Sequence, residues 1–217
     1  MVEENKNNVL LVGKVLSVKV KYTYNSKVFY EAMIEVARKS DNKDILPAII
    51  PGELMFRNEI KAGDNITLEG EIRMSNSKEE NGHRNIYVYC HVKDYDIFAD
   101  EYWDVMSDHN VVELEGYVCP SPRYRVTSYS NKEITDLLIA NNRRNGKAYY
   151  IPCIAWGLLA KMASKFKVGD KIRLKGRFQS RRYKADPLNG KPNDYSIQEI
   201  SIQEVAVLEE AKAVKSA

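Results

Sequence analysis

An internal repeat limits the fold of this chain more than any other feature of its sequence. Three segments of the first half recur in the second: residues 9–15 in 112–118, 47–52 in 152–157, and 63–70 in 169–176. The glycines that they share are 103, 105 and 106 residues apart: Gly13 and Gly116, Gly52 and Gly157, Gly70 and Gly176. The 217 residues leave room for two domains of about 100 residues each. We therefore expect two copies of one fold, residues 1–104 (copy one) and 105–217 (copy two).

Copy two has the pattern of a small β-barrel. Apolar alternation predicts five strands, near residues 111–119, 133–141, 148–156, 171–183 and 194–207. The pairs Asn145-Gly146 and Asn189-Gly190 are typical of hairpin tips. Apolar residues at helical spacing between strands three and four predict a short helix that stops before Gly169. Five strands and one such helix indicate an all-β OB-fold barrel in each copy. From this pattern alone, another five-stranded barrel or a small sandwich remains the alternative.

The two halves differ in charge. Residues 1–109 hold 14 Lys and Arg against 19 Asp and Glu, a net charge of −5. Residues 110–217 hold 19 Lys and Arg against 11 Asp and Glu, a net charge of +8. This asymmetry suggests a polyanionic partner for copy two.

Alternation on the third and fourth strands of copy two predicts an outer face of rings and cations. On the third strand, Tyr150 and Trp156 share one side, opposite the smaller residues Ile151, Cys153 and Ala155 that suit an interior. On the fourth strand, Ile172, Leu174 and Phe178 face the core, so the other side carries Lys171, Arg173, Lys175, Arg177, Gln179, Arg181 and Tyr183. We expect these two strands to be neighbours that place the rings beside the cations.

Such a face suits single-stranded nucleic acid. Cations neutralise phosphates, and exposed rings stack on bases that a duplex would hide. Taken singly, a tryptophan at a strand end is more often part of a core, and alternating Lys and Arg usually form a solvated surface. Further candidates follow the first strand or lie in a hairpin: Arg123, Tyr124, Arg125, Tyr129, Arg143 and Arg144. RNA stays open as a ligand, because nothing in the pattern senses a 2′-hydroxyl.

Copy one lacks these features at the matched positions. Ile45 and Pro51 replace the two rings, and the cation positions hold Asn65, Thr67, Glu69 and Glu71. That face should repel phosphate, so we expect copy one to serve assembly or contact with a partner. Four rings around its first hairpin leave room for weak contact with a strand: Tyr22, Tyr24, Phe29 and Tyr30.

Two segments of copy two resemble the bacterial single-stranded-DNA-binding proteins. Residues 149–160 look like the third strand and helix start of that family, and residues 176–183 are similar to its fourth-strand motif. The resemblance covers nearly all of residues 110–208. It implies OB folds, and it implies that the rings at Tyr150, Trp156 and Tyr183 stack on bases. Copy one resembles the family in spacing and departs from it at each stacking position.

The resemblance also implies partners. The family usually gathers four OB domains, so two per chain imply a homodimer that acts in DNA replication, repair or recombination. The family's acidic recruitment tip has no match in Val214-Lys215-Ser216-Ala217. The alternative function is a primosome-type adaptor that acts through protein contacts.

Other function classes find no support in the sequence. It shows no phosphate-binding glycine loop and no carboxylate cluster or His pair on the candidate face, so we expect no enzyme and no cofactor. The three cysteines and three histidines have no metal-ligand spacing, so we expect no metal. Without a signal peptide or a membrane span in the pattern, we expect a cytoplasmic protein.

Overall fold

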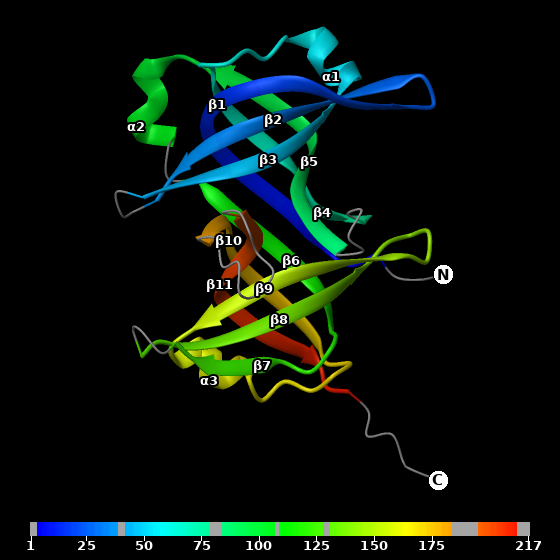
Figure 1. Ribbon diagram of the computed structural model, residues 1–217, viewed down its shortest axis with the longest axis vertical. Coiled ribbons are helices and arrows are strands. Elements are labelled where there is room, and N and C mark those ends of the chain that lie inside the picture. Colours follow the sequence, from blue (N-terminus) through cyan, green and yellow to red (C-terminus); the bar gives the residue numbers. More distant parts are fainter. Residues whose placement is uncertain are drawn as a thin grey trace. The chain divides into compact units, whose positions relative to one another are not determined.

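The structure is a computed structural model that describes residues 4–38, 42–78, 84–106, 109–127, 131–183 and 195–211. Strands dominate it, and every helix is short (Figure 1). In chain order the elements are β1 (Asn7–Tyr24), β2 (Lys27–Ala37), β3 (Lys43–Pro51), α1 (Gly52–Arg57), β4 (Asn65–Lys78), β5 (Arg84–Phe98), η1 (Asp100–Tyr102), α2 (Trp103–Met106), β6 (Asn110–Val118), β7 (Arg123–Val126), β8 (Glu133–Asn142), β9 (Ala148–Trp156), α3 (Leu158–Ala163), β10 (Lys171–Tyr183) and β11 (Tyr195–Glu209).

The chain divides into two compact units, each built around one copy. The N-terminal unit comprises Asn8–Val111 and Phe178–Glu199, and the C-terminal unit comprises Met1–Asn7, Val112–Arg177 and Ile200–Ala217. The units therefore depart from the expected boundaries, 1–104 and 105–217, in three segments: residues 1–7, 105–111 and 178–199. Whether each copy folds alone within those boundaries stays a prediction.

Each unit contains a closed five-stranded barrel. In the N-terminal unit the strands pair in the order β1-β2-β3-β5-β4 and back to β1, and in the C-terminal unit in the order β6-β8-β9-β11-β10 and back to β6. The third and last strands of each barrel run parallel, with Ala48 opposite Cys90 and Cys153 opposite Ile200. A short helix follows the third strand in both, α1 and α3. The predicted all-β class with two OB-fold barrels is confirmed.

Two of the three glycine pairs shared by the copies, Gly13 with Gly116 and Gly70 with Gly176, lie where the backbone of another strand approaches closely. A Cβ on Gly13 would lie 2.5 Å from the carbonyl oxygen of Glu35, and a Cβ on Gly116 would lie 2.6 Å from that of Ala140. Any larger residue at these positions would force the strands apart. The repeat in the sequence therefore reflects one steric requirement that is met twice.

The structure departs from the predicted strands at two points. The loop expected after the first strand of copy two contains β7, which is separated from β6 by Pro120 and Pro122, residues without an amide donor for a sheet. The expectation that the third and fourth strands are neighbours is wrong, because β11 lies between β9 and β10 in the sheet order. The reason is topological: the last strand closes the barrel by pairing with both. Asn189-Gly190 and Tyr129 lie outside the described residues.

The buried carboxylate of Glu31 in the N-terminal unit should make the free energy of unfolding depend on pH. Burial would raise the pKa of Glu31, but hydrogen bonds from Lys21, Tyr87 and Lys19 lower it from 4.5 to about 2. The charged form is thus favoured in the folded state, and its contribution is present above pH 4.5 and is lost as the pH falls towards 2. Urea unfolding between pH 7 and pH 2.5 should show this loss in the wild type and a weaker one in Glu31→Gln. Parallel pH profiles for the two proteins would contradict it.

Within the part of the chain that the structure describes, no group of three His, Cys, Asp or Glu side chains is placed to hold a metal ion. None of the helices among the described residues is long and apolar enough to cross a membrane.

Candidate nucleic-acid interface

The two rings predicted on β9 lie on the outer face of the C-terminal unit. Tyr150 is 43% exposed and Trp156 is half-buried, whereas Ile151, Cys153 and Ala155, which alternate with them, are buried. The outward direction of this face therefore matches the prediction. In the sheet register Ile134 of β8 lies between Trp156 of β9 and Arg125 of β7, and only 1% of its surface is exposed.

A hollow of about 730 Å³ opens beside the indole of Trp156. It is lined by Val126, Asn131, Lys132, Glu133, Trp156 and Gly157. Gly157 has a backbone φ of +57°, which side-chain-bearing residues rarely adopt, and its N–H donates to the carbonyl of Glu133 over 3.0 Å. This turn lets the chain leave β9 for α3 directly after Trp156. The ring therefore stands at the edge of a concave surface of a size that accepts a flat ligand.

Two arginines of β7 share the face that carries Trp156. Arg125 binds both oxygens of Asp136, over 2.7 and 3.2 Å, and so neutralises that carboxylate. Arg123 is exposed, and Asp136 lies opposite it in the register. Tyr124 alternates to the other side, in line with the buried residues Thr135 and Ala155, and its hydroxyl donates to Glu133 over 2.9 Å. On this strand the arginines, rather than Tyr124, share the face of Trp156.

The row of cations on β10 faces acids of β6 in the sheet register. Arg173 lies opposite Glu115 and bonds to it over 2.7 Å, and Lys175 lies opposite Glu113. Glu113 also binds Lys6, whose hydrogen bond lowers the pKa of that carboxyl. The charge of Arg173 is therefore balanced by the neighbouring strand, whereas the acid opposite Lys175 is already bound by Lys6, and the pattern of β10 alone could not show either pairing.

The remaining cations of the row differ in setting. Lys171 is 7% exposed, bonds to Glu209 over 3.5 Å, and has its ammonium 6.0 Å from the ring centre of Tyr117. Arg177 is half-buried. In the hairpin between β8 and β9, Arg143 is half-buried, with its guanidinium carbon 4.5 Å from the ring centre of Tyr149. Lys171 is thus held inside the fold, while Arg143 stiffens a hairpin at the edge of the Tyr150 face.

Tyr183 and Arg181 belong to the N-terminal unit, in which the end of β10 is included. The Arg181 guanidinium stacks on the Tyr183 ring at 5.1 Å and bonds to Glu199 over 2.9 Å. The C-terminal unit thus brings Tyr150, Trp156 and the β7 arginines onto one face. Tyr183 is described within the N-terminal unit, where its ring contacts Arg181.

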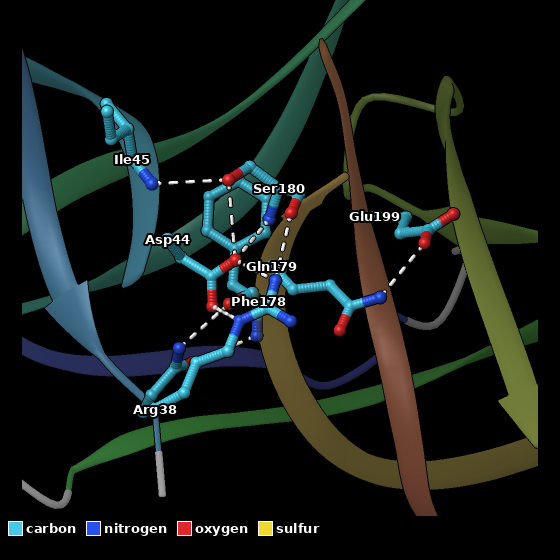
Figure 2. A network of polar contacts seen from close by, with 8 residues as sticks. Arg38, Asp44, Ile45, Phe178, Gln179, Ser180 and Glu199 are labelled. Atoms are coloured by element: carbon cyan, nitrogen blue, oxygen red, sulfur yellow. Dashed lines mark hydrogen bonds and ion pairs between the residues drawn. The ribbon is translucent and has the colours of Figure 1, made fainter. Parts of the chain in front are cut away.

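A buried acid of β3 holds the strand that leads to Tyr183 (Figure 2). Asp44 has no exposed surface and accepts hydrogen bonds from both arms of Arg38, over 2.5 and 2.8 Å. It also accepts the backbone N–H of Ser180 over 2.8 Å and the Ser180 hydroxyl over 3.3 Å. Arg38 donates in turn to the Ser180 carbonyl over 2.9 Å, and the Ile45 N–H donates to the Ser180 hydroxyl over 3.2 Å. This polar network therefore fixes the end of strand β10 at Ser180.

Reasoning from sequence missed this network. Its signal was an acid within the otherwise apolar run 44–50 of a barrel strand. A buried charge requires a partner, but the partners are far away in sequence, at position 180 above all. The place of Arg123 on a strand was also missed, because it was grouped with loop residues.

Comparisons with known proteins bear on the family of the C-terminal half and on the fold. Residues 109–208 match the model of the Single-strand binding protein family. The wild-type single-stranded DNA binding protein from Thermus aquaticus has a similar structure, with a TM-score of 0.73, 17% identity, and coverage of 99% of this chain and 98% of that one. A deletion mutant of the same Thermus protein gives a TM-score of 0.73 at 16% identity, covering 98% of this chain and 99% of that one. At these identities the likeness shows the fold. A search of curated protein sequences gave no match.

Proposed function

Because residues 109–208 belong to the Single-strand binding protein family, we propose that this chain binds single-stranded DNA, without catalysis, through the outer face of β7, β8 and β9. The observation that carries the proposal is the placement of Trp156 and Tyr150 on that face, beside a concave surface and the arginines of β7. Bases of an unpaired strand stack on the rings, and its phosphates meet Arg123 and the rim of the hollow. The cations of β10, Tyr183, Tyr124 and Arg143 remain predicted contacts.

We place this activity in the cytoplasm, where single strands arise during DNA replication, repair and recombination. Two OB barrels in one chain support a homodimer with four barrels, a number that the family resemblance implies. Sedimentation of the purified chain, alone and with DNA, tests the dimer directly. RNA is a competing ligand, and oligo(U) measured beside oligo(dT) distinguishes the two.

Tryptophan fluorescence tests the function. The chain has two tryptophans, so a Trp103→Phe variant leaves Trp156 as the single reporter. Titration with oligo(dT) should quench it, and the affinity should fall at higher salt as counterion release weakens. Duplex DNA of the same length should leave the signal unchanged, because its bases offer no free faces. Absence of both quenching and binding would favour the adaptor function, which the acidic charge of copy one supports.

Arg123 and Arg173 provide a matched pair for the phosphate path. Each phosphate contact with a single strand contributes about 0.7 to the slope of log affinity against log salt concentration. Arg123→Gln should reduce the slope by about this amount, because the acid opposite it is already neutralised by Arg125. Arg173→Gln should change it less, because Arg173 bonds to Glu115. Equal reductions would place the β10 row on the path of the DNA as well.

A further inference from the structure

We infer that the N-terminal unit carries a second base-stacking face for single-stranded DNA, on β1, β2 and β5 instead of the third strand. This aromatic face consists of Tyr22, Phe29, Tyr87, Tyr89 and His91. The inference rests on the proposed function, since it assigns the same ligand to a second surface. The expectation from sequence was that copy one mainly serves assembly or contact with a partner, with weak contact to a strand around its first hairpin; this inference assigns it a stacking face.

The register of the two barrels shows that the aromatic face matches the face around Trp156. In copy one, Pro51 of β3 lies opposite Phe29 of β2, and Phe29 lies opposite Tyr22 of β1. The corresponding row of copy two, 103 to 105 residues later in sequence, holds Trp156, Ile134 and Arg125. The ring lost at Pro51 is thus replaced by two rings on the next strands of the same row. A comparison of third-strand positions alone could not detect this exchange.

The first two rings form an open stack. Tyr22 and Phe29 have ring centres 4.9 Å apart with planes inclined by 24°, and Phe29 lies 6.4 Å from the ring of His91. Tyr22 is 42% exposed, and Tyr24, two residues along the same side of β1, is exposed further. A base can therefore reach the outer ring, while Phe29 supports it from behind.

The second pair of rings lies on β5. Tyr87 and Tyr89 have centres 5.5 Å apart and an interplanar angle of 28°. In the parallel pairing His91 lies beside Ile49, and in copy two Ser201 lies beside Ile154. Counting back along both strands, the positions of Tyr87 and Tyr89 correspond to Ile197 and Glu199 of copy two. These rings are therefore an addition specific to copy one.

The charges around the aromatic face favour phosphate. Glu31 is bonded by Lys19 over 3.0 Å and Lys21 over 2.6 Å. Glu71, which by sequence alone counted as a negative charge on this face, is bonded by Arg73 over 3.2 Å and Lys93 over 2.7 Å. Each acid therefore has two cations and each cluster keeps a net positive charge.

The cations also lie close to the rings. The Lys21 ammonium is 4.7 Å from the ring centre of Tyr87, and the side chains of Lys19 and Lys93 are mostly exposed. An exposed ring at Tyr22, half-buried rings at Phe29 and Tyr89, and positive clusters beside them suit the sequence-tolerant binding of a single strand. A protein partner that buried this surface would have to desolvate both clusters, which makes it the less favourable occupant.

The test uses the full chain and fluorescently labelled oligo(dT). In a background with Tyr150→Ala and Trp156→Ala, the residual affinity should fall about five-fold or more when Tyr22→Ala is added. Tyr102→Ala is the matched control, because Tyr102 is an exposed tyrosine of the same unit in η1 and away from this face, and it should change nothing. Photocrosslinking with an oligonucleotide that carries 5-iodouracil should label peptides from β1 and β5.

The outcomes separate the two proposals. If the unmodified chain fails to bind oligo(dT), the proposed function is wrong. If it binds, but Tyr22→Ala has no effect and crosslinks occur in copy two alone, the second face is overturned. A change in sedimentation for Tyr22→Ala without a change in DNA affinity would also overturn it, and would assign the surface to contact with a second copy of the chain.

Discussion

Replacing Asp44 with alanine should lower the free energy of unfolding by about 3 kcal/mol, measured by urea denaturation near pH 7. Asp44 is fully buried and accepts hydrogen bonds from Arg38 and from the N–H and hydroxyl groups of Ser180. Its removal leaves the guanidinium without its hydrogen-bonded carboxylate and the Ser180 N–H without its acceptor. The loss belongs at the lower end of the range for broken buried pairs, because Arg38 is partly exposed and can turn towards water.

Two further variants serve as a control and as an intermediate case for Asp44→Ala. Asp96→Ala removes an exposed acid of β5 in the same unit and should cost at most about 0.5 kcal/mol. Asp44→Asn keeps the shape but not the charge and should fall between the two. If Asp44→Ala unfolds at the same urea concentration as the wild type, the network does not contribute to stability in solution. Ser180 is three residues from Tyr183. The affinity of Asp44→Ala for oligo(dT) therefore also reports whether the end of β10 that carries Tyr183 contacts DNA.

Trp156→Ala should weaken binding of oligo(dT) by about 5- to 150-fold, the equivalent of about 1–3 kcal/mol for one base stack. The indole lies on the outer face of β9 and lines the hollow beside Glu133 and Gly157. A titration by fluorescence anisotropy of labelled DNA avoids dependence on the tryptophan signal. Trp156→Tyr keeps a ring at this position and should recover much of the affinity.

The control for Trp156→Ala is Leu158→Ala. Leu158 is an exposed apolar residue two positions further on, at the start of α3, and its loss should not affect DNA affinity. Urea denaturation of both variants checks that Ile134, next to Trp156 in the register, remains within a folded barrel. Unchanged affinity in a folded Trp156→Ala protein would move the DNA path away from β9.

Much of the fold was predictable because its requirements are local or repeated. Alternating apolar residues in 148–156 and 171–183 matched β9 and β10 to the residue. Gly116 and its partner Gly13 marked the close strand crossings in both barrels. β7 was not predicted, because four residues between prolines and a polar loop form a strand only when β8 is there to pair with them.

The site was predictable in part. Period-two alternation correctly placed Tyr150 and Trp156 on an outer face, since the direction of a side chain depends on parity within one strand. It could not show that Arg173 and Lys175 face Glu115 and Glu113, because cross-strand partners depend on register. Summing the charges of one strand therefore overstated the cationic surface of β10.

The amino-acid sequence therefore determined the repeat and the local geometry: two barrels, the direction of each strand face, and the match of residues 109–208 to a family model. Tertiary structure alone decided which strands are neighbours, which charges cancel, and which rings share a row. It placed β11 between β9 and β10, joined Asp44 to Ser180, and brought Tyr22 and Phe29 together across from Pro51. The physical reason is the distance in sequence over which each interaction acts. Steric alternation acts between neighbouring residues, whereas pairing, ion pairs and stacking act between residues that only the folded chain brings into contact.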